Sequence, residues 1–234
     1  MQGKDPTNWM YTPSRPVYYA SFGRRPKSLL SREEKFNLAI AMGTLTLCLT
    51  LVMNYGLANT LAILKTNPFA VIFLAVIAGV TTATGFAMHE LAHKFVAQRY
   101  GCWAEFRYSL RGLLFALFTS VFGVLLAAPG AVYIAGMVGK RENGLISIAG
   151  PLTNVVIAIV MLPIAILFNP TPIAYAAMTV AYFNAFLAAF NMVPIMPLDG
   201  AKVLRWSLPI YIISLVLMVG LLVFSFIIQP SIHI

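Results

Sequence analysis

The sequence predicts an all-α polytopic membrane protein, and three observations support this fold class. Apolar residues make up 60% of the 234 positions and charged residues only 10%, whereas a soluble domain has about a quarter of its residues charged. Several uncharged stretches exceed the roughly 20 residues that a helix needs to cross hydrocarbon. The polar segments between these stretches are short. We therefore expect one membrane-embedded domain over residues 36–234, preceded by a basic N-terminal extension over residues 1–35.

The uncharged stretches predict about five full transmembrane helices and a sixth segment that enters the membrane without crossing it. The stretch over residues 143–198 is long enough for two spans, and Phe168-Asn169-Pro170-Thr171-Pro172 divides it because proline interrupts a helix. The remaining stretches are residues 36–64, 66–88, 112–139 and 206–234.

Two of the three histidines stand four residues apart, in His89-Glu90-Leu91-Ala92-His93. Four residues is just over one helical turn, so both imidazoles project from one face. This spacing suits two ligands of a tetrahedral zinc ion, and the glutamate beside them can take a proton from a zinc-bound water. The motif follows 23 uncharged residues. Ionisable groups at such a place are costly unless paired, liganded or hydrated, so we favour a metal site over an ordinary helix surface.

A catalytic zinc usually has three protein ligands and one open position for water. Of the seven acidic residues, five lie in the N-terminal extension or in polar loops, one is Glu90, and Asp199 ends a long apolar run. Pro194 and Pro197 precede Asp199, so the helix should unwind there, which is tolerated at membrane depth where the backbone lines a cavity. The sequence predicts one Zn²⁺ per chain, bound by His89, His93 and Asp199. The alternative for Asp199 is a plain Asp-Gly turn.

These motifs resemble the site-2 protease family of intramembrane zinc metalloproteases. That family joins an H-E-x-x-H helix to a later N-x-x-P-x-x-x-x-D-G segment, matched here by Asn191, Pro194, Asp199 and Gly200. Between them, Gly150-Pro151-Leu152-Thr153-Asn154 is similar to the family's G-P-x-x-N helix start. The resemblance covers residues 77–205, and we expect the core of the membrane-embedded domain over residues 69–205.

The resemblance implies a function and a role for each matched residue. His89, His93 and Asp199 would bind zinc, Glu90 would be the catalytic base, and Asn154 and Asn191 would contact the substrate. The activity implied is regulated intramembrane proteolysis, the hydrolysis of peptide bonds in transmembrane segments of other membrane proteins.

The position of the zinc ligands constrains the topology. His93 and Asp199 each end a span, so they share one depth only if one intervening stretch does not cross. The best candidate is residues 112–139, which Pro129-Gly130 divides. We expect residues 113–128 to enter the membrane and residues 131–137 to return extended. The strand-like residues 129–136 are expected either to pair with an extended peptide or to form a plain turn.

The basic residues agree with this topology. With a re-entrant segment, 15 of the 16 Lys and Arg residues fall on one side and only Lys65 on the other, whereas full crossing would give 11 and 5. The positive-inside rule then places the N-terminus and the zinc end in the cytoplasm and the C-terminus outside. It also accounts for the net charge of +9 without nucleic acid. The expected partners are the lipid bilayer and a transmembrane protein substrate.

Two other functions remain open. An ion transporter or channel could use the histidines and Asp199 as an ion path, but further intramembrane charges and internal repeats would then be expected. A membrane zinc-binding module without proteolytic activity could keep the same ligands.

Overall fold

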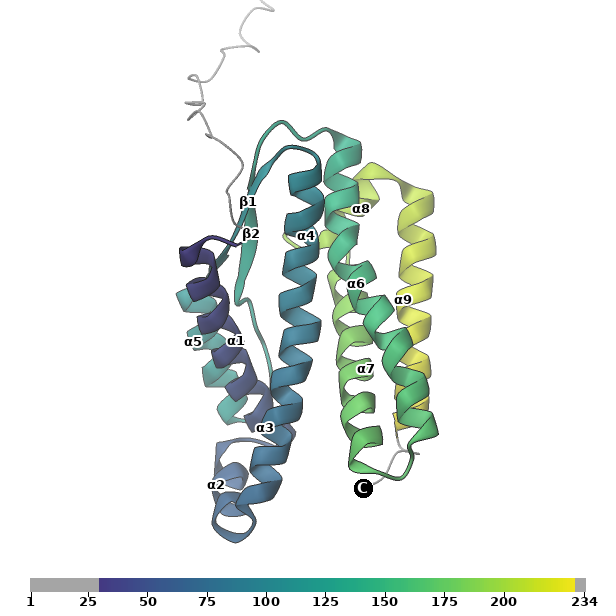
Figure 1. Cartoon of the computed structure of the whole chain (residues 1–234). Coiled ribbons are helices and arrows are strands. Elements are labelled where there is room, and N and C mark those ends of the chain that lie inside the picture. The colour runs from purple at the N-terminus through teal and green to yellow at the C-terminus, as the bar shows by residue number, and fades with distance from the viewer. Residues whose placement is uncertain (1–29, 230–234) are drawn as a thin grey trace, which may run out of the picture.

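The computed structural model describes residues 30–229, which form a bundle of long helices with one small sheet at one end (Figure 1). The predicted N-terminal extension lies outside the described residues, except for residues 30–35. Within the described part, five helical segments are long and apolar enough to cross a membrane. The fold is that of an all-α polytopic membrane protein, as predicted. The five are α1 (Arg32–Met53), the continuous segment Pro68–Arg99, α6 (Lys140–Leu167), α7 (Pro172–Asn191) and α9 (Leu208–Ile228).

Helix α1 begins four residues before the apolar stretch that predicted it. The Ser31 hydroxyl accepts the backbone N–H of Glu34 at 3.0 Å, and this cap, with acidic residues in the first turn, stabilises the helix start. The apolar stretch was expected to continue to residue 64, but the chain turns at Tyr55 and Gly56, whose φ angles are 60° and 104°. The short helix α2 (Leu57–Thr66) follows.

The segment Pro68–Arg99 is one rod made of three parts. Helix α3 (Pro68–Thr82) is followed by a π-helical turn, η1 (Ala83–Ala87), and then by α4 (Met88–Arg99). The π-helical turn lies immediately before the histidine motif. Along its length the rod contacts α1 and α7 through α3, and α6 through α4.

A two-stranded antiparallel sheet follows the rod. Strand β1 (Trp103–Tyr108) pairs with β2 (Gly130–Ala135) from Trp103↔Ala135 to Tyr108↔Gly130. Helix α5 (Leu110–Val121) lies between the strands in sequence. The Ser109 N–H donates to the Pro129 carbonyl at 2.8 Å. Because the chain leaves and re-enters the sheet at the same place, the connecting segment returns without crossing, which confirms the predicted re-entrant segment.

The re-entrant segment reverses earlier than its sequence indicated. We expected the inward part to reach residue 128, but α5 ends at Val121 and Gly123, with φ of 78°, turns the chain. The turn lies against the α1–α2 connection, where a Cβ on Gly56 would be 2.6 Å from the Val121 carbonyl oxygen. The early reversal therefore depends on a left-handed glycine and on contact between two distant loops.

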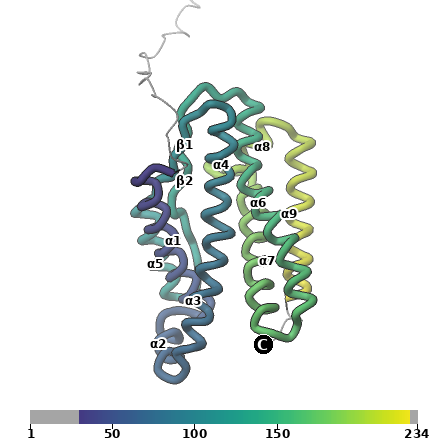
Figure 2. The backbone as a smooth tube through the Cα atoms, viewed as in Figure 1, coloured from purple at the N-terminus to yellow at the C-terminus, as the bar shows by residue number. Residues whose placement is uncertain are grey.

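The C-terminal half of the described chain contains α6 to α9. The resemblance implied a helix start at Gly150-Pro151, but α6 begins at Lys140 and Pro151 lies inside it. Proline can stand inside this helix because its φ angle is compatible with a helix and its missing N–H leaves only one carbonyl without a hydrogen bond. Glu142 in the first turn favours the earlier start. The chain then unwinds over residues 192–198, as predicted, before α8 (Asp199–Trp206). Figure 2 shows α6–α9 grouped beside the helices and sheet of the N-terminal half.

Candidate metal centre

His89, His93 and Asp199 come together where α4 meets the start of α8. The Nε2 atoms of His89 and His93 are 3.0 Å apart. Asp199 Oδ2 lies 3.3 Å from the first and 3.0 Å from the second. All three side chains are buried. Gly200 permits this placement, because a Cβ there would lie 2.1 Å from the Met192 carbonyl oxygen.

Hydrogen bonds on the far side of each imidazole fix which nitrogen faces the site. Asn154 Nδ2 donates to the Gly85 carbonyl at 3.0 Å, so its Oδ1 must accept, and His89 Nδ1 donates to it at 3.1 Å. His93 Nδ1 donates to the Ile146 carbonyl at 2.7 Å. With Nδ1 engaged in this way, each ring directs Nε2 toward Asp199, where it can offer a lone pair to a metal ion, the arrangement typical of metal-binding histidines.

This arrangement of acceptors fits a zinc ion. Two lone pairs and a carboxylate oxygen at 3.0–3.3 Å repel one another unless a cation lies among them. Two ligand atoms of a tetrahedral zinc with bonds of about 2.0 Å are about 3.3 Å apart. Gly150 of α6 leaves room at this place, because a Cβ there would lie 2.5 Å from His93 Nε2 and 2.6 Å from His89 Nε2.

The neighbours of Asp199 keep its side chain in the carboxylate form, which can bind a cation. Its second oxygen, Oδ1, accepts a hydrogen bond from Lys202 Nζ at 3.2 Å. When protons take the place of an ion, burial raises the pKa of the Asp199 carboxyl, but the charge of His93, hydrogen bonds from both histidines and the charge of Lys202 outweigh burial and hold that pKa below its usual range. The group is therefore a carboxylate.

Glu90 lies between the two histidines in sequence and faces the sheet. Its Oε2 accepts the backbone N–H of Val132, on β2, at 3.2 Å. The same cavity contacts Glu90, the three candidate ligands and β2. A carboxylate with one oxygen held in this way keeps its other oxygen for a second partner.

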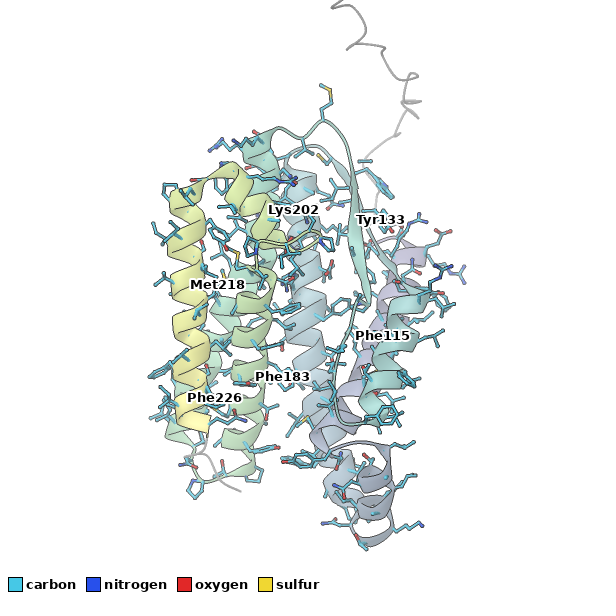
Figure 3. The ribbon with its side chains drawn as sticks, turned by 180° about the vertical axis from the view of Figure 1, so that it is seen from behind. Phe115, Tyr133, Phe183, Lys202, Met218 and Phe226 are labelled. Carbon is cyan, nitrogen blue, oxygen red and sulfur yellow. The ribbon has the colours of Figure 1, made fainter. Side chains whose placement is uncertain are left out.

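The cavity has a volume of about 560 Å³ and is mostly apolar. The N-terminal half lines it with α1, α3 and β2, and the C-terminal half with α6, α7 and α8. Phe183, Phe186 and Phe190 form its wall on α7. Figure 3 shows Lys202 and Tyr133 toward the same end of the bundle, with Phe183 further along α7. The candidate metal ligands thus line a mostly apolar cavity.

The chain is similar to two proteins of Methanocaldococcus jannaschii. One, whose name of zinc metalloprotease is provisional, is 39% identical over 150 residues, which cover 63% of this chain and 78% of the relative. The chain belongs to this family of zinc metalloproteases. The other, named a zinc metalloprotease, is 31% identical over 163 residues, which cover 69% of this chain and 40% of that relative. No family model and no solved structure matches the chain.

The two asparagines of this zinc metalloprotease occupy different positions. Asn154 is fully buried, and both ends of its amide are engaged by His89 and Gly85, so it is placed to orient His89 rather than to reach a substrate. Asn191 lines the cavity, and its Nδ2 donates to the Leu187 carbonyl at 2.9 Å. Its Oδ1 is the end available to a bound molecule.

Sequence reasoning missed several groups around the metalloprotease site. The Ile146 carbonyl and the Val132 N–H belong to the backbone, so no residue type in the sequence signals them. Lys202 was counted only as a basic residue of the cytoplasmic side, although it follows the Asp-Gly pair by two residues. That proximity to a candidate ligand is the signal that could have identified it.

Proposed function

We propose that this zinc metalloprotease is an intramembrane endopeptidase of the site-2 protease type, which hydrolyses peptide bonds in transmembrane segments of membrane proteins. The observation that carries the proposal is the joint exposure of Glu90 and the three candidate ligands to one apolar cavity. The walls of that cavity include helices long enough to span a membrane. An active site in such a place is suited to apolar, membrane-embedded peptide.

The chemistry assigns a distinct task to each residue. His89, His93 and Asp199 would hold Zn²⁺, which would supply an activated water and polarise the scissile carbonyl. Glu90 accepts the proton of that water and returns it to the leaving amine. Because the Val132 N–H holds Oε2, Oε1 carries the proton. Asn154 and the Ile146 carbonyl keep both imidazoles oriented.

Strand β2 is suited to hold the substrate. A helical segment must unwind before its amide reaches the site, because helical hydrogen bonds occupy its carbonyls. The Val132 N–H points away from β1, toward Glu90, and the twofold alternation of a strand directs the Ile134 N–H to the same edge. Both residues line the cavity. An extended peptide can add to this edge, with its side chains against the phenylalanines of α7 and its backbone within reach of Asn191.

We infer the orientation of the protein in the membrane from the positions of its basic residues. Within residues 30–229, Lys65 on α2 is at the end of the bundle opposite the metal centre, while the other Lys and Arg residues belong to segments at or near the metal-centre end (Figure 1). We propose that this basic end and the N-terminus lie in the cytoplasm and the C-terminus outside. The partners are then the lipid bilayer and a transmembrane protein substrate.

Zinc content and peptide cleavage, measured on the same purified samples in detergent, test the proposal. We expect about one zinc per wild-type chain and a strong loss in His93→Ala and Asp199→Ala, because a catalytic zinc usually has three protein ligands. Glu90→Gln should keep its zinc but cleave a reconstituted transmembrane peptide at least about 100-fold more slowly.

The outcomes separate the three candidate functions. Full zinc retention in Asp199→Ala, or no zinc in folded wild type, would contradict the metal centre and favour an ion path. Zinc binding without cleavage of any transmembrane peptide would favour a binding module. Equal cleavage by Glu90→Gln and wild type would remove Glu90 from the reaction.

A further inference from the structure

A buried ion pair beside the metal centre joins α1 to α4. Lys94 Nζ donates to Glu34 Oε2, and the two side chains are 3% and 0% exposed. Removing two charges from water disfavours such a pair, and apolar replacements are often as stable. The pair therefore calls for a role beyond holding two helices together.

The second oxygen of Glu34 points to that role. Glu34 Oε1 accepts the backbone N–H of Phe106, on β1, at 3.0 Å. Phe106 lies opposite Val132 in the sheet, and the Val132 N–H donates to Glu90 Oε2 at 3.2 Å. Each N–H points outward from its own edge. The sheet thus lies between two carboxylates, with Glu34 at the β1 edge and Glu90 at the β2 edge.

Helix α4 provides both attachments. Glu90 and Lys94 are four residues apart, so they lie on one face of the helix. Glu90 contacts β2 directly, whereas Lys94 reaches β1 through Glu34. The buried ring of Phe106 also packs edge-on against Phe86 of η1, with ring centres 5.5 Å apart. The sheet is therefore fixed relative to the helix that carries the histidine motif.

We propose that Glu34 is a positioning residue for Glu90 and that Lys94 neutralises it. The proposal rests on the proposed function, in which Glu90 transfers the proton. The Glu34 acceptor fixes β1, the pairing of the strands fixes the Val132 N–H, and that N–H holds Glu90 Oε2 so that Oε1 faces the water. Glu34 acts through the sheet and does not touch the substrate.

Two matched double variants isolate the acceptor from the charge. Glu34→Gln with Lys94→Met keeps an acceptor for the Phe106 N–H and removes both charges. Glu34→Met with Lys94→Met removes both charges and that acceptor. In the Gln–Met chain the NH2 end of the glutamine amide is buried, which is unfavourable. This cost would lower the activity of the Gln–Met chain, so it acts against the difference that we expect between the two variants.

We expect both double variants to bind zinc. The Gln–Met chain should cleave a transmembrane peptide within about threefold of wild type, and the Met–Met chain should lose roughly tenfold or more in kcat at unchanged KM. Glu34→Asp, which keeps the charge but withdraws the acceptor, is a second variant with the same expected loss if Met–Met does not fold. Equal kcat in the Gln–Met and Met–Met chains, or a wild-type kcat in Glu34→Asp, would overturn the proposal.

Amide hydrogen exchange of residues 130–135 gives a readout that needs no activity. Exchange in β2 should be faster in the Met–Met and Glu34→Asp chains than in wild type and unchanged in the Gln–Met chain, with zinc bound throughout. If wild type cleaves nothing, the proposed function fails, yet exchange still reports whether Glu34 holds β2. Unchanged exchange in both acceptor-deficient chains would exclude coupling across the sheet.

Discussion

The lack of a side chain at Gly150 keeps the space beside the metal ligands open. Its α-carbon faces both ligand nitrogens, and a Cβ would lie 2.5 and 2.6 Å from them, within the space of the proposed ion. Helix α6 is also held close by Gly144, where a Cβ would lie 2.4 Å from the Trp206 ring. The helix therefore has little freedom to move away from an added methyl group.

We expect Gly150→Ala to weaken zinc binding at least about tenfold while the chain still folds, because the methyl group displaces the ligand atoms from their geometry. Zinc per chain after dialysis against a buffered zinc series measures this. Gly220→Ala in α9 is the matched control, since nothing lies within 4 Å of its added Cβ. Equal zinc affinity in the two variants would place the ion elsewhere.

At this scale the sequence predicts the ligands better than their surroundings. Histidine and carboxylate are scarce in this chain, with 3 and 7 examples, and the cost of charge near a membrane makes each one informative. Glu34 was not identified as a functional residue, because its charged neighbours, from Arg32 to Lys35, resemble a polar extension. Its burial depends on Lys94, 60 positions away, and no local pattern records that contact.

Strand β2 is the element that links the metal centre to a substrate. Its odd-numbered residues face β1 in hydrogen-bonded pairs, and its even-numbered residues direct their N–H groups toward the cavity, as the Val132 bond to Glu90 shows. The Ile134 N–H is therefore available to a peptide but does not belong to the ladder.

Proline at position 134 removes that N–H and leaves the ladder intact, which is tolerated on an edge strand. We expect Ile134→Pro to raise KM for a transmembrane peptide roughly tenfold with zinc content unchanged, because one intermolecular hydrogen bond is lost. Steady-state cleavage kinetics give the value. Ile134→Val keeps the N–H and serves as control; similar KM values for the two variants would exclude pairing of the substrate at this position.

The helices were predicted from the uncharged stretches, and their topology from two constraints, the depth of the ligands and the distribution of basic residues. Neither constraint fixes where a segment turns. Residues 113–128 are almost uniformly apolar, so the reversal at Gly123 depends on its contact with the α1–α2 turn. Similarly, the resemblance marks Gly150-Pro151 as a helix start, but Pro151 lies inside α6, whose packing against α4 and α7 overrides the low preference of proline for a helix interior.

The orientation of the whole molecule across the membrane can be tested in cells. Thr66 ends α2 and Met137 follows β2, and both are exposed. The two elements lie toward opposite ends of the bundle (Figure 1). Single cysteines at these positions, in a chain with Cys48 and Cys102 replaced by alanine, would report which end faces outward.

We expect an impermeant thiol reagent added to intact cells to label Thr66→Cys and not Met137→Cys, because basic ends remain in the cytoplasm. After permeabilisation both positions should react, which controls for burial. Labelling of Met137→Cys in intact cells would reverse the proposed orientation and place the metal centre outside.

The π-helical turn η1 sets the angle at which the metal ligands are presented. Each residue of an α-helix advances the direction of its side chain by about 100°, and a π-helical turn accommodates one additional residue. Without it, His89 and His93 would point about 100° further round the rod and away from α6. The rod can therefore turn one side to α1 along α3 and another to α6 along α4. The additional residue of the π-helical turn changes the direction in which the following side chains point. It shifts them along the helix axis by only about 1.5 Å.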